Sequence, residues 1–201
     1  MNQRNHIEKE LKLCLSEAHY ISLCEYLVRN SSLINIHEQC NIYLETEDNY
    51  FANNREMLRL RETENFWTLT HKSRIKVNDG EFSSHESETD LGYFEGTIID
   101  LTTKVQQLEP WNQLKPLIVQ GQLLNTRHEF KWKDFTLELD RSQFSNQRID
   151  FELECETLEF ERLRDSLAEL FEQLRIPWKP QDTSKYKRFL ESLDSHLNNP
   201  L

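Results

Sequence analysis

Glu8-Lys9-Glu10-Leu11-Lys12, near the start of the chain, is the stretch that decides how the rest is interpreted. A β-strand directs successive side chains to opposite faces, so Glu8, Glu10 and Lys12 would share one face. Two carboxylates and an amine on one face suit a divalent cation beside a phosphate, because carboxylate oxygens are hard metal ligands and the amine is a compact positive charge. An exposed sheet face alternates in the same way, so the pentapeptide alone does not decide.

Later strands repeat this alternation, with one largely apolar face and one polar or charged face. The polar faces carry Arg59 and Arg61; Thr68, Thr70 and Lys72; Arg127, Glu129 and Lys131; Thr136, Glu138 and Asp140; and Glu152, Glu154 and Glu156. Side chains two residues apart on a strand lie roughly 6.6–6.8 Å apart, so like charges repel unless a counter-ion lies among them. The acidic and basic groups together indicate a bound metal and a bound polyanion.

Two folds explain this pattern, and the residues alone leave both open. In the first, a half-solvated antiparallel sheet packs its apolar face on helices, and water screens the charges. In the second, the sheet closes into a barrel whose apolar face lies under the helices and whose charged face lines a central tunnel.

Composition narrows the class of protein. The chain has 201 residues, a formal net charge of −11, 37% apolar and 29% charged residues. We expect a single domain over residues 1–201, long enough for a closed barrel. The acidic balance argues against nucleic-acid or anionic-membrane partners, and the four cysteines show no CxxC or secreted pattern. Residues 1–10 lack an apolar signal core and no apolar run could span a bilayer, so we expect a cytoplasmic protein.

Strands and helices alternate irregularly along the chain. The pattern predicts strands near 8–12 and at 33–45, 56–61, 66–72, 84–88, 118–131, 134–141 and 148–156, and helices at 16–30 and 96–108. Asn78-Asp79-Gly80 is a strong turn signal. Two apolar stripes predict closing helices, one capped by Thr157 and one that begins near Asp182 and buries residues as far as Leu197.

The ordered set of charged strands resembles the CYTH superfamily, the triphosphate tunnel metalloenzymes. Glu8-x-Glu10-x-Lys12 is similar to the ExExK signature of that family, and Leu58-Arg59-Leu60-Arg61 is similar to its arginine pair. The later matches are Thr70-His71-Lys72, Arg127 with Leu139-Asp140, Glu152 to Glu156, and Ser184-Lys185-Tyr186. The resemblance implies an α+β fold, a closed eight-stranded antiparallel β-barrel with a charged interior flanked by helices.

The resemblance also implies an activity, the hydrolysis of a triphosphate with Mg²⁺ or Mn²⁺. The implied phosphate-binding residues are Lys12, Arg59, Arg61, Lys72, Arg127 and Lys185. Glu8, Glu10 and Glu156 would hold the metal that orients the triphosphate, and Asp140 and Glu154 would help a second metal or position the attacking water. The catalytic set is then Glu154, Asp140 and Lys72, while the roles of Glu86, Glu88 and Glu152 are open.

Some residues depart from the pattern of the family. Asn125 and Gln143 stand where many relatives carry basic residues, and Glu45 replaces a common aspartate. The strand alternation turns Trp67 and Trp132 towards the helices, away from a ligand.

Inorganic triphosphate is therefore the expected substrate. The alternatives are a thiamine or nucleoside triphosphatase, a class IV adenylyl cyclase, or a non-catalytic polyphosphate-binding module. We expect a small-molecule triphosphate as the partner of a monomer or homodimer.

Overall fold

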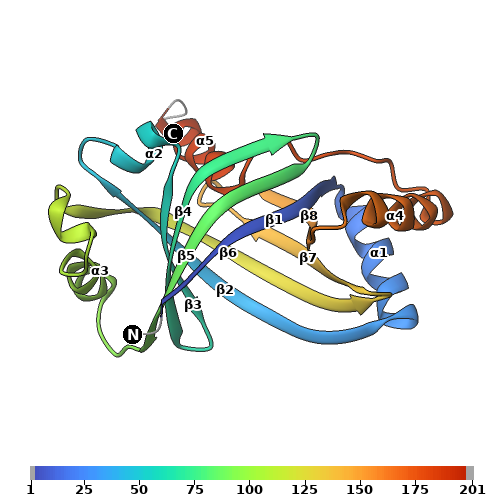
Figure 1. The fold of residues 1–201 in the computed structure, drawn as a ribbon, viewed down its shortest axis with the longest axis horizontal. Helices are drawn as coiled ribbons and strands as arrows, with labels where there is room; N and C mark the ends of the chain where they lie inside the picture. The colour runs from blue at the N-terminus through green and yellow to red at the C-terminus, as the bar shows by residue number, and fades with distance from the viewer. Residues whose placement is uncertain (1–2, 198–201) are drawn as a thin grey trace. The chain divides into compact units, whose positions relative to one another are not determined.

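The computed structural model describes the backbone of residues 3–197 and the side chains of residues 3–193, so the predicted burial of Leu197 lies outside the described residues. Within this part of the chain, eight antiparallel strands close into a barrel in the order β1-β5-β4-β3-β2-β6-β7-β8 (Figure 1). The expected fold class, a closed barrel with flanking helices, is confirmed. Among the described residues, no helix has the length and apolar character needed to cross a membrane.

The elements follow one another along the chain with short connections. The strands are β1 (Gln3–Leu15), β2 (Ser32–Thr46), β3 (Met57–Thr63), β4 (Phe66–Asn78), β5 (Glu81–Tyr93), β6 (Leu117–Trp132), β7 (Phe135–Gln143) and β8 (Ile149–Glu156). The helices are α1 (Glu17–Asn30), α2 (Tyr50–Asn54), α3 (Ile98–Gln106), α4 (Phe160–Leu174) and α5 (Lys185–Leu197), with a 3-10 turn η1 (Trp111–Gln113).

Most predicted elements are present, and the differences lie at their ends. Ser16 caps α1, since its side chain accepts a hydrogen bond from the backbone N–H of His19. The predicted cap of α4 is wrong: the N-cap residue is Glu159, and the Thr157 hydroxyl accepts the Glu159 N–H instead. The last helix begins at Lys185 and not near Asp182.

The chain packs as two compact units. Unit 1 comprises Gln39–Ile75, Ser84–Leu124 and the described residues up to Ile7; unit 2 comprises Glu8–Glu38, Lys76–Ser83 and the described residues from Asn125 onward. The expectation of a single domain over residues 1–201 stays a prediction.

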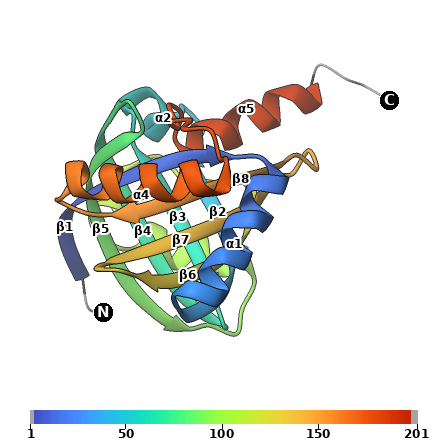
Figure 2. The same ribbon diagram turned by 90° about the vertical axis from the view of Figure 1, so that its right-hand side faces the viewer.

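Unit 2 has its own hydrophobic core beneath α1 and α4. Both helices cover the strands β1, β7 and β8, as Figure 2 shows. Leu23 of α1 and Leu163 and Leu167 of α4 are fully buried against Leu139 and Leu153 of the strands. The odd-numbered residues of β7 and β8 thus face this core, and their even-numbered acids point to the other face of the sheet.

Unit 1 has a second core, formed by the same alternation on other strands. Leu58 and Leu60 of β3 are fully buried against Leu101 of α3, Phe51 of α2 and Trp111 of η1. Because Leu58 and Leu60 face this core, their neighbours on β3 point to the opposite face.

In unit 2 a tight turn and a C-terminal segment hold the middle of β1. The turn joins β4 to β5 where the sequence predicts it, with Asp79 and Gly80 both at positive φ, 48° and 78°. The Gly80 carbonyl accepts the N–H of Lys12 at 2.8 Å, and the Lys12 carbonyl accepts the N–H of Gln181 at 3.0 Å. A Cβ atom on Gly80 would lie 2.7 Å from the Lys12 carbonyl oxygen, so this approach requires glycine.

Candidate active site

Three neighbouring strands of unit 2 bring charged residues together in register. Lys12 of β1 lies opposite Glu154 of β8, and Glu154 lies opposite Glu138 of β7. In the next row, Glu152 of β8 lies opposite Asp140 of β7. Opposite residues of an antiparallel pair point to the same face, so all five side chains converge there.

The centre of this face is an acidic trio, defined here as Asp140, Glu152 and Glu154. Each residue offers one carboxylate oxygen, and these oxygens all lie within 4.8 Å of one another. The three residues are 0%, 1% and 3% exposed. Asp140 and Glu154 are predicted site residues; Glu152 is the member to which the sequence assigned no role.

Arg127 of β6 contacts two members of the trio. Its guanidinium donates to both oxygens of Asp140, at 2.8 Å and 2.6 Å, and to Glu154 at 2.7 Å. It also forms an ion pair with Glu138. A planar guanidinium suits such forked contacts with carboxylates, and it suits phosphate oxygens equally well.

Two lysines also contact the trio. The Lys12 ammonium lies 2.7 Å from Glu154 and 3.0 Å from Glu10. The Lys185 ammonium, at the start of α5, lies 2.6 Å from Asp140, 2.7 Å from Glu152 and 3.3 Å from Glu154. Both lysines are predicted phosphate-binding residues.

A fourth cation, Arg188, is a site residue that the sequence analysis missed. It is 3% exposed, and its guanidinium donates to Asp150 at 2.7 Å and also to Glu152. Arg188 lies three residues after Lys185 on α5, so both side chains leave the same side of the helix. The helical pattern gave no signal for it, because at 100° per residue Arg188 lies on the side of the helix opposite the predicted apolar stripe.

The acids of this face have displaced pKa values. Burial alone would raise the pKa of Asp140 and Glu154, but Arg127 and the lysines outweigh burial and hold both values below the usual range. Burial dominates at Glu138: it raises the pKa to about 7 against the opposing charge of Arg127, and Glu154 raises it further. Asp140 and Glu154 are therefore charged at neutral pH, and Glu138 is close to half protonated.

Unit 1 holds a separate basic cluster, defined as Arg59, Arg61, Lys72 and their acid Glu86. The Lys72 ammonium lies 2.7 Å from Glu86, and Arg61 donates to Asn41 at 2.9 Å. Arg59 is 7% exposed and donates to Thr70 at 3.3 Å, while its buried Nε atom has no hydrogen-bond partner among the described residues.

Glu86 is the acid of this cluster, and its pKa shows how strongly cationic the cluster is. Burial alone would raise the pKa, but Lys72 and then Arg59 lower it to about 2. A group of cations that holds a carboxylate ionised in this way is suited to a second anion.

The remaining predicted metal ligands lie outside the trio. Glu10 is buried and is held by Lys12, Glu8 is half-buried, and Glu156 is exposed at the end of β8. Glu10 and Glu156 are opposite each other in register. Their assignment as metal ligands stays a prediction.

The departures from the family pattern have local structural explanations. Both carboxylate oxygens of Glu45 accept backbone N–H groups, among them those of Phe51 and Ala52, so Glu45 holds the start of α2. The side chain of Asn125 accepts the Ser142 hydroxyl at 2.8 Å, and both residues are buried. Asn125, which stands where the family pattern has a basic residue, therefore belongs to a neutral buried pair.

His71 lies on the face of β4 opposite the charged face that carries Lys72. Its Nε2 atom lies 2.9 Å from Glu56, and its ring packs on Phe51 and Trp111 of the unit 1 core. The prediction that His71 points away from Lys72 is confirmed.

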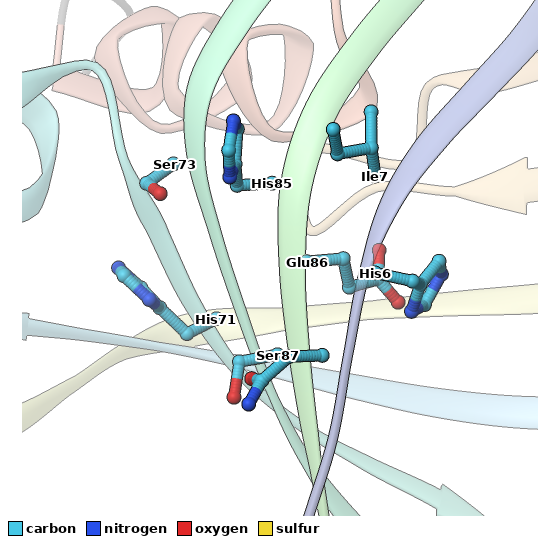
Figure 3. Close-up of a pocket in the computed structure, with 8 residues that line it drawn as sticks. His6, Ile7, His71, Ser73, His85, Glu86 and Ser87 are labelled. Atoms are coloured by element: carbon cyan, nitrogen blue, oxygen red, sulfur yellow. The ribbon is translucent and has the colours of Figure 1, made fainter.

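A pocket of about 400 Å³ lies beside His71 in unit 1 (Figure 3). Its lining includes His71 and Ser73 of β4, and His85, Glu86 and Ser87 of β5. His85 and Glu86 extend to opposite sides of the β5 ribbon in Figure 3. Glu86 is the one member of the basic cluster in this lining, so the pocket offers a polyanion none of the cations of that cluster.

The acidic trio fits a divalent cation by the chemistry of its donors. Three buried carboxylates provide hard oxygen ligands, which Mg²⁺ and Mn²⁺ prefer. Buried acids also provide more negative charge than a simple anion-binding site would tolerate.

Comparison with known proteins identifies the family of this chain. The sequence model of the CYTH domain matches residues 6–190. The chain therefore belongs to the CYTH domain family. A search of the curated proteins finds no match.

Solved structures share the fold at low sequence identity. A candidate adenylyl cyclase from Hippeastrum, described as having a dominant triphosphatase activity, is 24% identical with a TM-score of 0.81, over 92% of this chain and 95% of that chain. A candidate adenylate cyclase from Bacillus halodurans is 23% identical with a TM-score of 0.63, over 92% and 98%. The triphosphatase of the Mimivirus capping enzyme is 12% identical with a TM-score of 0.54, over 82% and 87%.

Proposed function

We propose that this protein hydrolyses a triphosphate with the help of a divalent metal ion, and that inorganic triphosphate is its substrate. The observation that carries the proposal is the direct contact of a buried acidic trio with lysine and arginine side chains. Acids alone would suit a metal, and cations alone would suit an anion. Their combination suits a metal ion and a phosphate chain bound side by side.

In this proposal the cations bind phosphate oxygens. The proposed phosphate-binding residues are Lys12, Arg59, Arg61, Lys72, Arg127 and Lys185. Each now contacts a carboxylate, a hydroxyl or an amide, and a phosphate oxygen would take over the same donors. Positioning and neutralisation of charge supply most of the catalysis in phosphoryl transfer, which is the role proposed for Lys72 as well.

Asp140, Glu152 and Glu154 would hold the metal ion, with Glu8, Glu10 and Glu156 proposed for a further one. The chemistry supplied by Mg²⁺ or Mn²⁺ is neutralisation of the phosphate charge and polarisation of water. Asp140 and Glu154 remain ionised at neutral pH, so they can orient an attacking water through its hydrogen atoms. Glu138, with a pKa of about 7, can accept or release a proton nearby.

The choice of substrate rests on the aromatic residues. All four tryptophans pack in or against the two hydrophobic cores: Trp132 and Trp178 in unit 2, and Trp67 and Trp111 in unit 1. This packing favours a substrate without a base that needs stacking. The triphosphatase activities described for the Hippeastrum and Mimivirus proteins support triphosphate hydrolysis in general.

A second candidate is the adenylyl cyclase activity named in the descriptions of the Hippeastrum and Bacillus proteins. A thiamine or nucleoside triphosphatase and a non-catalytic polyphosphate-binding module are further alternatives. A pure polyphosphate binder is disfavoured because the buried trio would repel its ligand. We propose no nucleic-acid or membrane partner, a monomer or homodimer, and a cytoplasmic location.

The test is a panel of substrates. Inorganic triphosphate, ATP and thiamine triphosphate are each incubated with the protein, with and without Mg²⁺ or Mn²⁺, and released phosphate and cyclic AMP are measured. The proposal expects metal-dependent release of phosphate, fastest from inorganic triphosphate. Formation of cyclic AMP and pyrophosphate from ATP would favour the cyclase, and no turnover of any substrate by folded protein would exclude all the enzyme candidates.

A further inference from the structure

Lys185 occupies an unusual position relative to the acidic trio. Its ammonium contacts Asp140, Glu152 and Glu154, at 2.6, 2.7 and 3.3 Å. Within the part of the chain whose side chains are described, every ion pair of Lys185 is with a member of the trio, and it contacts all three members. The lysine lies where a cation bound by these three carboxylates would lie.

A metal ion and this ammonium would compete for the same oxygens. A carboxylate oxygen that accepts a hydrogen bond from an ammonium at 2.6 or 2.7 Å uses a lone pair for that contact, and the ammonium neutralises part of its charge. Two cations a few ångströms apart repel strongly in a buried site, where the effective dielectric constant is low. This repulsion disfavours holding both cations at the trio.

Lys185 is better placed to leave than Arg127. Arg127 projects from a barrel strand and is held by two hydrogen bonds to Asp140, a third to Glu154 and an ion pair with Glu138. Lys185 is the first residue of α5 and carries its charge on a flexible four-carbon chain. Arg188 can keep α5 in place meanwhile, because its contacts with Asp150 and Glu152 do not involve Lys185.

We propose that Lys185 is an internal competitor of the divalent metal ion for the acidic trio, and that it moves to a phosphate oxygen of the substrate when the metal binds. The second half of this statement rests on the proposed function. The consequence is coupling: the metal ion displaces Lys185, and a triphosphate gives the displaced ammonium a new partner. Metal and triphosphate should then bind more tightly together than separately.

The main test compares Lys185→Gln with Lys187→Gln. Lys187 is an exposed residue of the same helix, so its replacement removes the same charge away from the trio. Isothermal titration with Mn²⁺ alone should show roughly 10-fold tighter binding for Lys185→Gln and parent-like binding for Lys187→Gln. With saturating Mn²⁺, Lys185→Gln should bind triphosphate on the order of 10-fold more weakly. Mn²⁺ binding that is unchanged or weaker in Lys185→Gln overturns the proposal.

A second measurement uses the parent protein and does not depend on how the variant folds. Lysine acetylation by a small reagent, followed by mass spectrometry, reports how available each amine is. Mn²⁺ should raise the acetylation rate of Lys185 several-fold relative to Lys187, and further addition of triphosphate should lower it again. A Lys185 rate that does not respond to Mn²⁺ contradicts displacement.

These measurements separate the inference from the proposed function. Tighter Mn²⁺ binding by Lys185→Gln, in a protein that hydrolyses no triphosphate, would support the competition and refute the enzyme. Hydrolysis by the parent, with no effect of Lys185→Gln on Mn²⁺ binding, would do the reverse.

Discussion

Replacing Arg127 with methionine tests the electrostatic account of the unit 2 face. The change removes the ion pair with Glu138 and the contacts with Asp140 and Glu154, while Lys185 still neutralises those last two acids. Removing one partner of a buried ion pair costs about 3–5 kcal/mol, and the remaining lysine should hold the loss to the lower part of that range.

The cost should also depend on pH, because Glu138 loses its arginine. Its pKa in the folded parent is already about 7, above the ordinary value of 4.5, and Arg127 is the group that lowers it most. Without Arg127 the folded-state pKa rises further. Below pH 6 Glu138 is then mostly protonated in both proteins and adds little to the difference. Above pH 7 ionised Glu138 penalises the variant more, by roughly 1–3 kcal/mol at pH 9.

Urea unfolding followed by circular dichroism, at pH 6 and pH 9, measures this difference. Arg29→Met is the matched control, because Arg29 forms an exposed pair with Glu25 and its loss should cost less than about 1 kcal/mol at either pH. In the double variant Arg127→Met with Glu138→Gln, the additional cost at pH 9 should disappear. An equal loss of stability at both pH values, unaffected by Glu138→Gln, would refute the reasoning.

Three further predictions concern other parts of the molecule. Lys72→Ala should lower kcat/KM for triphosphate on the order of 10²-fold in a phosphate-release assay, whereas His71→Ala should not, and equal losses would contradict the assignment of the β4 faces. The pKa of Glu86 in the folded protein is about 2, so ionised Glu86 stabilises the fold above pH 4.5 and this stabilisation is lost as the pH falls from 4.5 towards 2. The free energy of unfolding, measured by urea titration over this pH range, should show the loss in the parent and not in Glu86→Gln. The same pH dependence in both proteins would contradict the prediction. Gly80→Ala should lower the melting temperature by several degrees, because its Cβ atom would meet the Lys12 carbonyl at positive φ, and a melting temperature equal to that of the parent would show that the turn can relax.

Much of the site follows from the period-2 alternation of strands. Glu154 and Asp140 were assigned to one face because their neighbours Leu153 and Leu139 are apolar, and the structure buries those leucines in the unit 2 core. The same reasoning separated Lys72 from His71. These predictions succeed because strand geometry is local, and one buried neighbour determines the face.

The rest of the site depends on contacts that the sequence does not encode locally. On β8 the acids at 152, 154 and 156 look equivalent in sequence, yet Glu152 is buried beside Asp140 and Glu156 is exposed at the strand end. Which of them joins the trio depends on the register with β7. The position of Arg188 depends on how α5 docks, which is a tertiary contact. β5 was predicted too short because its polar residues carry little apolar alternation.

The most direct test of the central claim is release of phosphate from inorganic triphosphate by the parent and by Glu154→Gln at saturating Mn²⁺. Glu169→Gln, at an exposed position of α4, is the control. The account predicts metal-dependent turnover by the parent and the control, and a loss on the order of 10²-fold or more in Glu154→Gln, which keeps the shape of the side chain and removes one charge of the trio. Equal turnover by all three proteins, or no turnover by folded parent, would contradict it.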